Sequence, residues 1–90
     1  MPTETFDFSA ALLAVKDGKQ VGRKEWKNAK GVFLVAGSQF KVNRAPLNQF
    51  FAEGTEVTYR PHIDMQGADG TIGTWSPSMV DLMAEDWYVL

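Results

Sequence analysis

Apolar positions near the start of the chain recur at the spacing of one face of a helix. The positions i, i+3, i+4 and i+7 are occupied by Phe8, Ala11, Leu12 and Val15. This spacing is typical of an amphipathic helix that buries one side. Asp7 or Ser9 can cap the helix, because a short side-chain oxygen accepts hydrogen bonds from the free amides of the first turn. Gly18 is expected to end it.

The pattern then changes to short apolar runs, which predict strands. In order, we expect a strand over 20–23, a second over 31–36, a turn at Gly37-Ser38 and a short return strand over 39–42. The run Asn43-Arg44-Ala45-Pro46 predicts the entry to a short helix, because proline is favoured in a first helical turn. This helix is expected to continue through Phe50-Phe51.

Polar and apolar side chains alternate in the second half, which predicts a strand over 56–59 and another that contains Ile63 and Met65. Asp69-Gly70 predicts a hairpin with a type I′ turn, which needs positive φ at both central residues. The last elements are a return strand over 71–75, a helix capped by Ser76 that runs from Pro77 to about 84, and a strand over 87–90.

These elements predict an α+β fold, with an antiparallel sheet and two or three short helices in a single domain over residues 1–90. A chain of 90 residues buries a modest share of its surface, and the absence of cysteine removes disulfides as a source of stability. The three Trp, two Tyr and six Phe supply a dense aromatic core or contacts with other subunits. We therefore expect the domain to assemble as a homo-oligomer.

The charge and the apolar runs exclude several classes of protein. A net charge of -2 gives no electrostatic reason to expect DNA, RNA or an acidic membrane as a partner. The longest apolar run, 32–36, is too short to cross a bilayer. The start Met1-Pro2-Thr3-Glu4 lacks the basic and apolar regions of a signal peptide. We expect a soluble intracellular protein.

The residues for catalysis are few. His62 is the sole histidine, and no serine lies in a nucleophile motif. His62 and Asp64 project from the same face of an extended strand, with Asp69 near in sequence, but no third metal ligand stands at an established spacing. The sequence therefore predicts neither a catalytic residue, a metal site nor a cofactor.

Residues suited to binding are more prominent. Arg23 and Lys24 precede Trp26 in a basic cluster. Their cationic side chains suit a phosphate, and the flat Trp26 ring suits stacking on a base. Asn43 and Arg44 also suit a base edge and a phosphate, although Asn43 can instead cap the following helix. Trp26 could equally be a core or interface residue.

Two further features lie late in the chain. Trp75 precedes the expected Ser76-Pro77 helix start, whose free amides suit an anion. The acidic cluster comprises Asp81, Glu85 and Asp86, and Asp81 and Glu85 share a helical face if the helix extends that far. Such carboxylates belong to a solvated surface, bind sugar hydroxyls or act as an acid/base pair.

The order of several motifs resembles a known family. The motifs are Arg23-Lys24-x-Trp26, Phe40-Lys41-Val42-Asn43-Arg44-x-Pro46, Pro61-x-Ile63-x-Met65, Ala68-Asp69-Gly70-Thr71-Ile72 with Trp75, and Asp81-x-x-Ala84-x-Asp86-Trp87. Together they are similar to the small phage Thoeris anti-defence sponge proteins of the second type. The similarity extends from Phe8 to Val89.

The resemblance implies a phage protein without catalytic activity in the cytoplasm of the infected bacterial host. Such proteins sequester glycocyclic ADP-ribose, the cyclic ADP-ribose isomer made by TIR-domain enzymes of Thoeris, without cleaving it. They form homotetramers with ligand pockets between subunits. Some also hold cyclic oligonucleotides of the CBASS system at a second site.

At family-matching positions the chemistry of the side chains suggests roles. Trp26 stacks on adenine, and Trp75 is a second platform or a pocket wall. Arg23, Lys24 or Arg44 binds the pyrophosphate. Asn43 and Asp81 bind ribose hydroxyls or the base edge. We assign the following residues to the core or an interface: Phe8, Leu12, Val15, Phe33, Val35, Ile63, Ile72 and Trp87.

Two other functions stay open. One is a metal-dependent phosphodiesterase that degrades the same signal with His62, Asp64 and Asp69. The other is a phage protein that inhibits a host immune protein directly.

Overall fold

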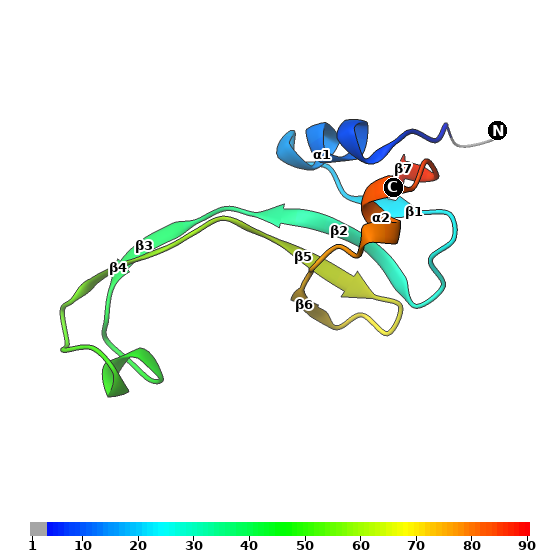
Figure 1. The fold of residues 1–90 in the computed structure, drawn as a ribbon. Coiled ribbons are helices and arrows are strands. Elements are labelled where there is room, and N and C mark those ends of the chain that lie inside the picture. The colour runs from blue at the N-terminus through cyan, green and yellow to red at the C-terminus, as the bar shows by residue number, and fades with distance from the viewer. Residues whose placement is uncertain (1–3) are drawn as a thin grey trace.

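A computed structural model describes residues 4–90. Residues 1–3, which enter the signal-peptide prediction, lie outside this range. The chain forms a head, made of two helices and a five-stranded sheet, and a long two-stranded arm that projects from it (Figure 1). The elements are α1 (Phe8–Lys16), β1 (Val21–Arg23), β2 (Ala29–Val35), β3 (Ser38–Lys41), the 3-10 helix η1 (Leu47–Gln49), β4 (Glu56–Tyr59), β5 (His62–Gly67), β6 (Ile72–Thr74), α2 (Met79–Met83) and β7 (Trp87–Val89).

The head is built around an antiparallel sheet with the strand order β6-β5-β2-β1-β7. The last strand lies beside the early part of the chain. Strand β7 pairs with β1, with Arg23 opposite Trp87, and a bridge joins Phe6 to Trp87. Helix α1 packs against β1, β2 and β7. The α+β class, the antiparallel sheet and the small single domain are therefore confirmed, with two α-helices.

The first helix follows its sequence pattern closely. Asp7 is the cap and accepts from the amide of Ala10 at 3.1 Å, which decides between the two predicted caps. Ala11 and Val15 face the sheet and are buried in the core with Val21, Val32 and Trp87. Of the other residues predicted for the core or interface, Phe8, Leu12, Phe33, Val35 and Ile63 are half-buried and Ile72 is exposed.

The prediction of a turn at Gly37-Ser38 is wrong. The chain continues through these residues into the arm. Strand β3 continues outward beyond β2 and pairs with β4, while β2 pairs with β5, so that two long strands run side by side (Figure 1). Gly37 is needed for close approach, since a Cβ there would lie 2.5 Å from the carbonyl oxygen of Tyr59. The glycine lets the two strands stay close side by side, and neither reverses direction there.

The hairpin between β5 and β6 is confirmed, but its turn is not type I′. Within this hairpin only Gly70 has a positive φ, of 90°, and throughout residues 4–90 positive φ occurs at glycines alone. The Gly70 amide donates to the Gly67 carbonyl at 3.0 Å, and the Gly67 amide donates to the Thr71 carbonyl at 2.8 Å. This is a three-residue loop that closes with a glycine bulge.

Two helix starts also differ from the predictions. Helix α2 is capped by Ser78 rather than Ser76, because Ser78 forms a reciprocal capping box with Asp81. The short helix η1 is a 3-10 turn whose N-cap is Pro46, with no side-chain cap. The suggestion that Asn43 caps this helix is therefore wrong.

The helices of residues 4–90 are all too short or too polar to cross a membrane.

We predict that Gly37→Ala destabilises the arm, because its new methyl group meets the backbone of the opposite strand. Overpacking of this kind costs about 1–3 kcal/mol. The measurements are thermal denaturation and hydrogen exchange of the amides of β3 and β4. Gly73→Ala is the control, since a Cβ at Gly73 meets nothing within 4 Å. Equal melting temperatures and equal exchange in the two variants would contradict the close approach.

Candidate functional site

The predicted binding residues lie in two separate places. Arg23, Lys24, Trp26, Trp75 and Asp81 belong to the head, whereas Asn43 and Arg44 follow β3 at the tip of the arm (Figure 1). In the described part of the chain, β3 and β4 contact each other and no other helix or strand. One copy of the chain therefore does not bring the two groups together.

Trp26 and Trp75 belong to an aromatic cluster on the head. The Trp26 ring lies 5.1 Å from that of Trp87 and 6.2 Å from that of Trp75, in edge-to-face arrangements. Phe8 completes the cluster, at 5.4 Å from Trp87 and 6.1 Å from Trp75. Trp87 is fully buried, while Trp26 and Trp75 are half-buried. The two partly exposed indoles are the ones predicted to meet a ligand.

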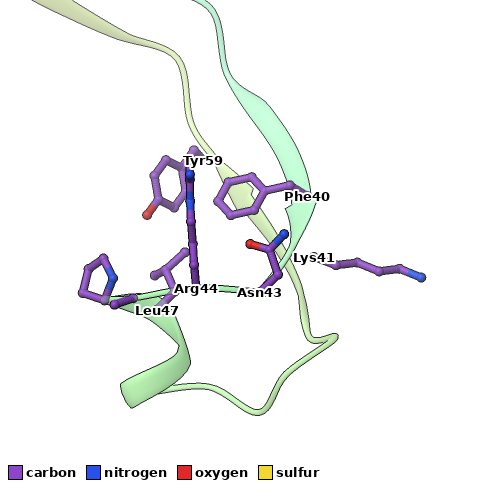
Figure 2. Close-up of a pocket in the computed structure, with 8 residues that line it drawn as sticks. Phe40, Lys41, Asn43, Arg44, Leu47 and Tyr59 are labelled. Carbon is purple, nitrogen blue, oxygen red and sulfur yellow. The ribbon is translucent and has the colours of Figure 1, made fainter.

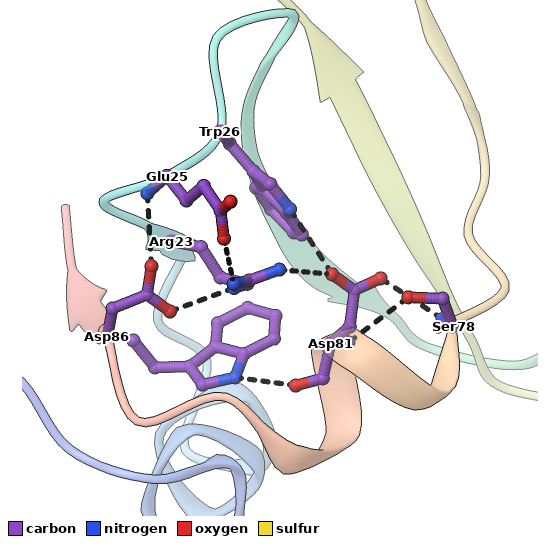
Figure 3. Close-up of polar contacts among 7 residues, drawn as sticks. Arg23, Glu25, Trp26, Ser78, Asp81 and Asp86 are labelled. Carbon is purple, nitrogen blue, oxygen red and sulfur yellow. Dashed lines mark hydrogen bonds and ion pairs between the residues drawn. The ribbon is translucent and has the colours of Figure 1, made fainter.

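Arg23 is the buried cation of the head, with 7% of its surface exposed. Its guanidinium donates to Asp86 at 2.8 Å, to Asp81 at 2.9 Å and to Glu25 at 2.7 Å (Figure 3). The bonds to Asp86, first of all, and to Asp81 raise the pKa of Arg23, although burial opposes them. The guanidinium is thus held by carboxylates, which favours Lys24 or Arg44 for the pyrophosphate. The role of Arg23 in ligand binding stays a prediction.

Asp81 joins this network to the aromatic cluster. Its Oδ1 accepts from Arg23 and, at 3.3 Å, from the indole Nε1 of Trp26, while its Oδ2 accepts from the Ser78 amide at 3.1 Å. Burial raises the pKa of Asp81, but these hydrogen bonds outweigh it and hold the pKa below its usual value. Asp81 is therefore a carboxylate that accepts hydrogen bonds, as a sugar-hydroxyl ligand must be.

The acidic cluster is arranged differently from the helical pair that was expected. Helix α2 ends at Met83, so Glu85 does not share a helical face with Asp81. Asp86 is the residue that joins Asp81, through Arg23. The anion site predicted at the Ser76-Pro77 helix start is also absent there, because the helix begins later and its Ser78 amide is bonded to Asp81.

A hollow lies beside Trp26 on the head. It has a volume of about 500 Å³, and Lys27, Asn28 and Met65 are among the residues that line it. Lys24 lies in the same loop, with its Nζ 4.3 Å from the centre of the Tyr88 ring. The Trp26 ring and these cations together suit a base and its phosphates.

The tip of the arm carries a second hollow, of about 590 Å³. Asn43, Arg44 and the rings of Phe40 and Tyr59 point toward it, whereas Lys41 points away (Figure 2). The two rings lie 5.3 Å apart, edge to face, across the β3–β4 pair. Aromatic walls with a few polar groups are typical of small-molecule sites.

The polar groups at the tip are free to bind. Within residues 4–90, neither the Asn43 amide nor the Arg44 guanidinium has a hydrogen-bonding or ionic partner, whereas all three sides of the Arg23 guanidinium are engaged. Arg44 is thus the arginine that can form a bidentate contact with a phosphate.

Sequence reasoning did not single out Phe40 and Tyr59 as walls of a site. Their contact depends on the register that places Phe40 opposite Val57 and Ser38 opposite Tyr59, and alternation alone does not set which strands pair. For Asp86 the sequence left a solvated surface, a ligand for sugar hydroxyls and an acid/base pair open, because its partner Arg23 lies 63 positions away.

His62 and Asp64 share a strand face, as predicted, with His62 Nε2 3.4 Å from Asp64 Oδ1. Asp69 is bonded instead to the amide and hydroxyl of Thr71, at 3.0 and 2.7 Å. Across the described residues, no group of three His, Cys, Asp or Glu side chains is placed to hold a metal ion. These residues do not form the three-ligand site that a metal-dependent phosphodiesterase would need.

The fold and the two hollows define a small α+β domain with candidate binding groups on a head and on a protruding arm. Residues 6–90 match the Tad2-like family, whose description is the Thoeris anti-defense 2-like domain. A relative from Bacillus phage SP01, Thoeris anti-defense 2, is 36% identical over 87 residues that cover 92% of this chain and 92% of the relative. The chain belongs to the Thoeris anti-defense 2-like family, which confirms the resemblance.

We predict that Arg23→Met costs about 3 kcal/mol at neutral pH, because it leaves two carboxylates without their buried cation. It also flattens the acid dependence of stability. The pKa values of Asp81 and Asp86 are lowered on folding, so their stabilisation is present above about pH 4 and is lost as the pH falls through the lowered values.

Thermal denaturation of both proteins from pH 7 to pH 2.5 measures this effect. Glu25→Gln is the control, since its carboxylate is exposed and its pair is worth less than about 1 kcal/mol. An Arg23→Met protein that melts like the control, with the acid dependence of the wild type, would contradict the assignment.

Proposed function

We propose that this protein is a phage anti-immune sponge. It binds and sequesters glycocyclic ADP-ribose, the signal made by TIR-domain enzymes of Thoeris, and does not cleave it. Membership of the Thoeris anti-defense 2-like family supports a phage anti-Thoeris function. The protein acts where the signal is made, in the cytoplasm of the infected host.

One observation carries this proposal: Asn43 and Arg44, whose side chains have no polar partner among residues 4–90, lie in a hollow walled by Phe40 and Tyr59. An unpaired arginine beside aromatic rings suits a ligand that contains both a phosphate and a base. The volume of about 590 Å³ lies in the range of small-molecule sites. The same combination of a ring and cations recurs at Trp26 on the head.

The binding groups of the head and those of the arm tip contact one ligand if the tip of one copy faces the head of another. We therefore propose a homotetramer in which each signal molecule lies between subunits. Exposed apolar side chains support assembly, because Phe50 and Phe51 on the arm and Met79, Val80 and Met83 on α2 are uncovered in a single copy. The exposed fraction of Phe50 and of Met83 is 73%.

Within this site Trp26 stacks on the adenine and Trp75 forms a wall. Arg44 binds the pyrophosphate from the arm, and Lys24 from the head. Asn43 and Asp81 bind ribose hydroxyls or the base edge. Stacking and charge-assisted hydrogen bonds together can supply the about −12 kcal/mol of a nanomolar complex. Binding of CBASS cyclic oligonucleotides at a second site stays a prediction.

We predict that glycocyclic ADP-ribose incubated with this protein is recovered intact and in stoichiometric amount after the protein is denatured. A sponge holds its ligand without turnover, whereas a phosphodiesterase leaves products in excess of the protein. Mass spectrometry of the released nucleotide distinguishes the two. Products in excess would overturn the sponge. A chain that binds no signal and yet blocks the effector would favour direct inhibition of a host protein.

We predict that Trp26→Ala weakens binding by about 10- to 100-fold through the loss of one stacked base. We expect Arg44→Ala to weaken it by about 10- to 100-fold too, through the loss of charge-assisted hydrogen bonds to the pyrophosphate. When the two variants are assembled together, roughly one quarter of the sites regain wild-type affinity, since random pairing unites an intact head with an intact tip. Calorimetric titration counts these sites. An absence of recovery in the mixture would contradict a site shared between copies.

A further inference from the structure

The loop between β1 and β2 is held in place from the C-terminal part of the chain. The Asp86 carbonyl accepts from the Lys24 amide at 3.1 Å, and Asp86 Oδ2 accepts from the Glu25 amide at 3.0 Å. The Trp26 amide donates to the Arg23 carbonyl at 3.1 Å, which closes the loop as a turn. The backbone that carries Trp26 is therefore fixed by Asp86.

The indole of Trp26 is fixed by the same network. Asp81 Oδ1 accepts both from Trp26 Nε1 at 3.3 Å and from Arg23 Nη1 at 2.9 Å (Figure 3). Arg23 Nε in turn donates to Asp86 Oδ1 at 2.8 Å. A continuous chain of contacts thus leads from Asp86 through Arg23 and Asp81 to the ring.

Burial makes this chain of contacts rigid. The side chain of Arg23 is 7% exposed, that of Asp81 13% and that of Asp86 30%. Among residues 4–90, no buried side-chain nitrogen or oxygen lacks a hydrogen-bond partner. Charge-assisted bonds in such surroundings are stronger and better oriented than those at an open surface.

We propose that Asp86 is a positioning residue for the ligand-stacking face of Trp26. It does not touch the ligand. It holds Arg23, which holds Asp81, which orients the indole. The inference rests on the proposed function, because it assumes that Trp26 stacks on a base. A ring that is already fixed loses little freedom on binding, so Asp86 contributes to affinity through preorganisation.

Asp86→Asn tests this role. The amide oxygen still accepts a hydrogen bond, but the negative charge that holds Arg23 is lost. We expect the NMR signal of the Trp26 indole N–H to move toward that of a solvent-exposed indole and to exchange faster with solvent. With glycocyclic ADP-ribose as the probe, we expect an affinity about 3- to 10-fold weaker, through faster dissociation.

Asp69→Asn is the matched control, because it removes a carboxylate charge from the β5–β6 turn, which has no bond to this network. Its indole signal and its affinity should equal those of the wild type. If Asp86→Asn does not fold, Arg23→Lys provides the same test, since a lysine ammonium does not offer the forked geometry that spans two carboxylates.

The indole signal is measured without ligand, so it separates this inference from the proposed function. A wild type that binds no nucleotide would overturn the sponge and, with it, the stacking role of Trp26. A wild type that binds, together with an Asp86→Asn protein whose Trp26 signal is unchanged, would overturn the positioning role alone. Weaker binding with an unchanged indole signal would also overturn it.

Discussion

The buried charge of Arg23 is the constraint on which the head depends. A guanidinium that is removed from water must be paired, and its three carboxylates come from Glu25 nearby and from Asp81 and Asp86 late in the chain. Satisfying it brings helix α2 and the approach to β7 against the end of β1. The Trp87 indole adds to this junction, since its Nε1 donates to the Asp81 carbonyl at 3.0 Å. One cation on β1 therefore holds the C-terminal part of the chain, through Asp81 and Asp86.

The arm, in contrast to the head, has few buried side chains. Its residues are mostly exposed, and Val42 is the one residue between 38 and 60 that is fully buried. A two-stranded ribbon of this kind is marginal in water by itself. The head has a core of its own, whereas the arm has one fully buried residue and exposed rings at its tip. This division agrees with the proposal that a second copy and a ligand meet there.

Local patterns predicted those parts of the fold that depend on local physics. The first helix, with Asp7 as one of its two predicted caps, and the presence of a hairpin near Gly70 follow from interactions within a few residues, whereas the type of the hairpin turn was predicted wrongly. The direction of β3 did not follow, because a glycine suits a turn and a close approach of two paired strands equally well. Helix α2 began later than expected, since the reciprocal bonds of Ser78 and Asp81 outweigh a cap followed by proline.

The sequence by itself determined the family, the α+β class and the residue types suited to a nucleotide, because these reside in composition, spacing and motif order. Only the tertiary structure decided where those residues lie. It placed Asn43 and Arg44 on an arm, bound Arg23 to carboxylates and set Trp26 against Asp81. Strand pairing joins Val21 to Val89, and buried charge compensation joins Arg23 to Asp86, 63 positions away. Local patterns do not encode which partners meet.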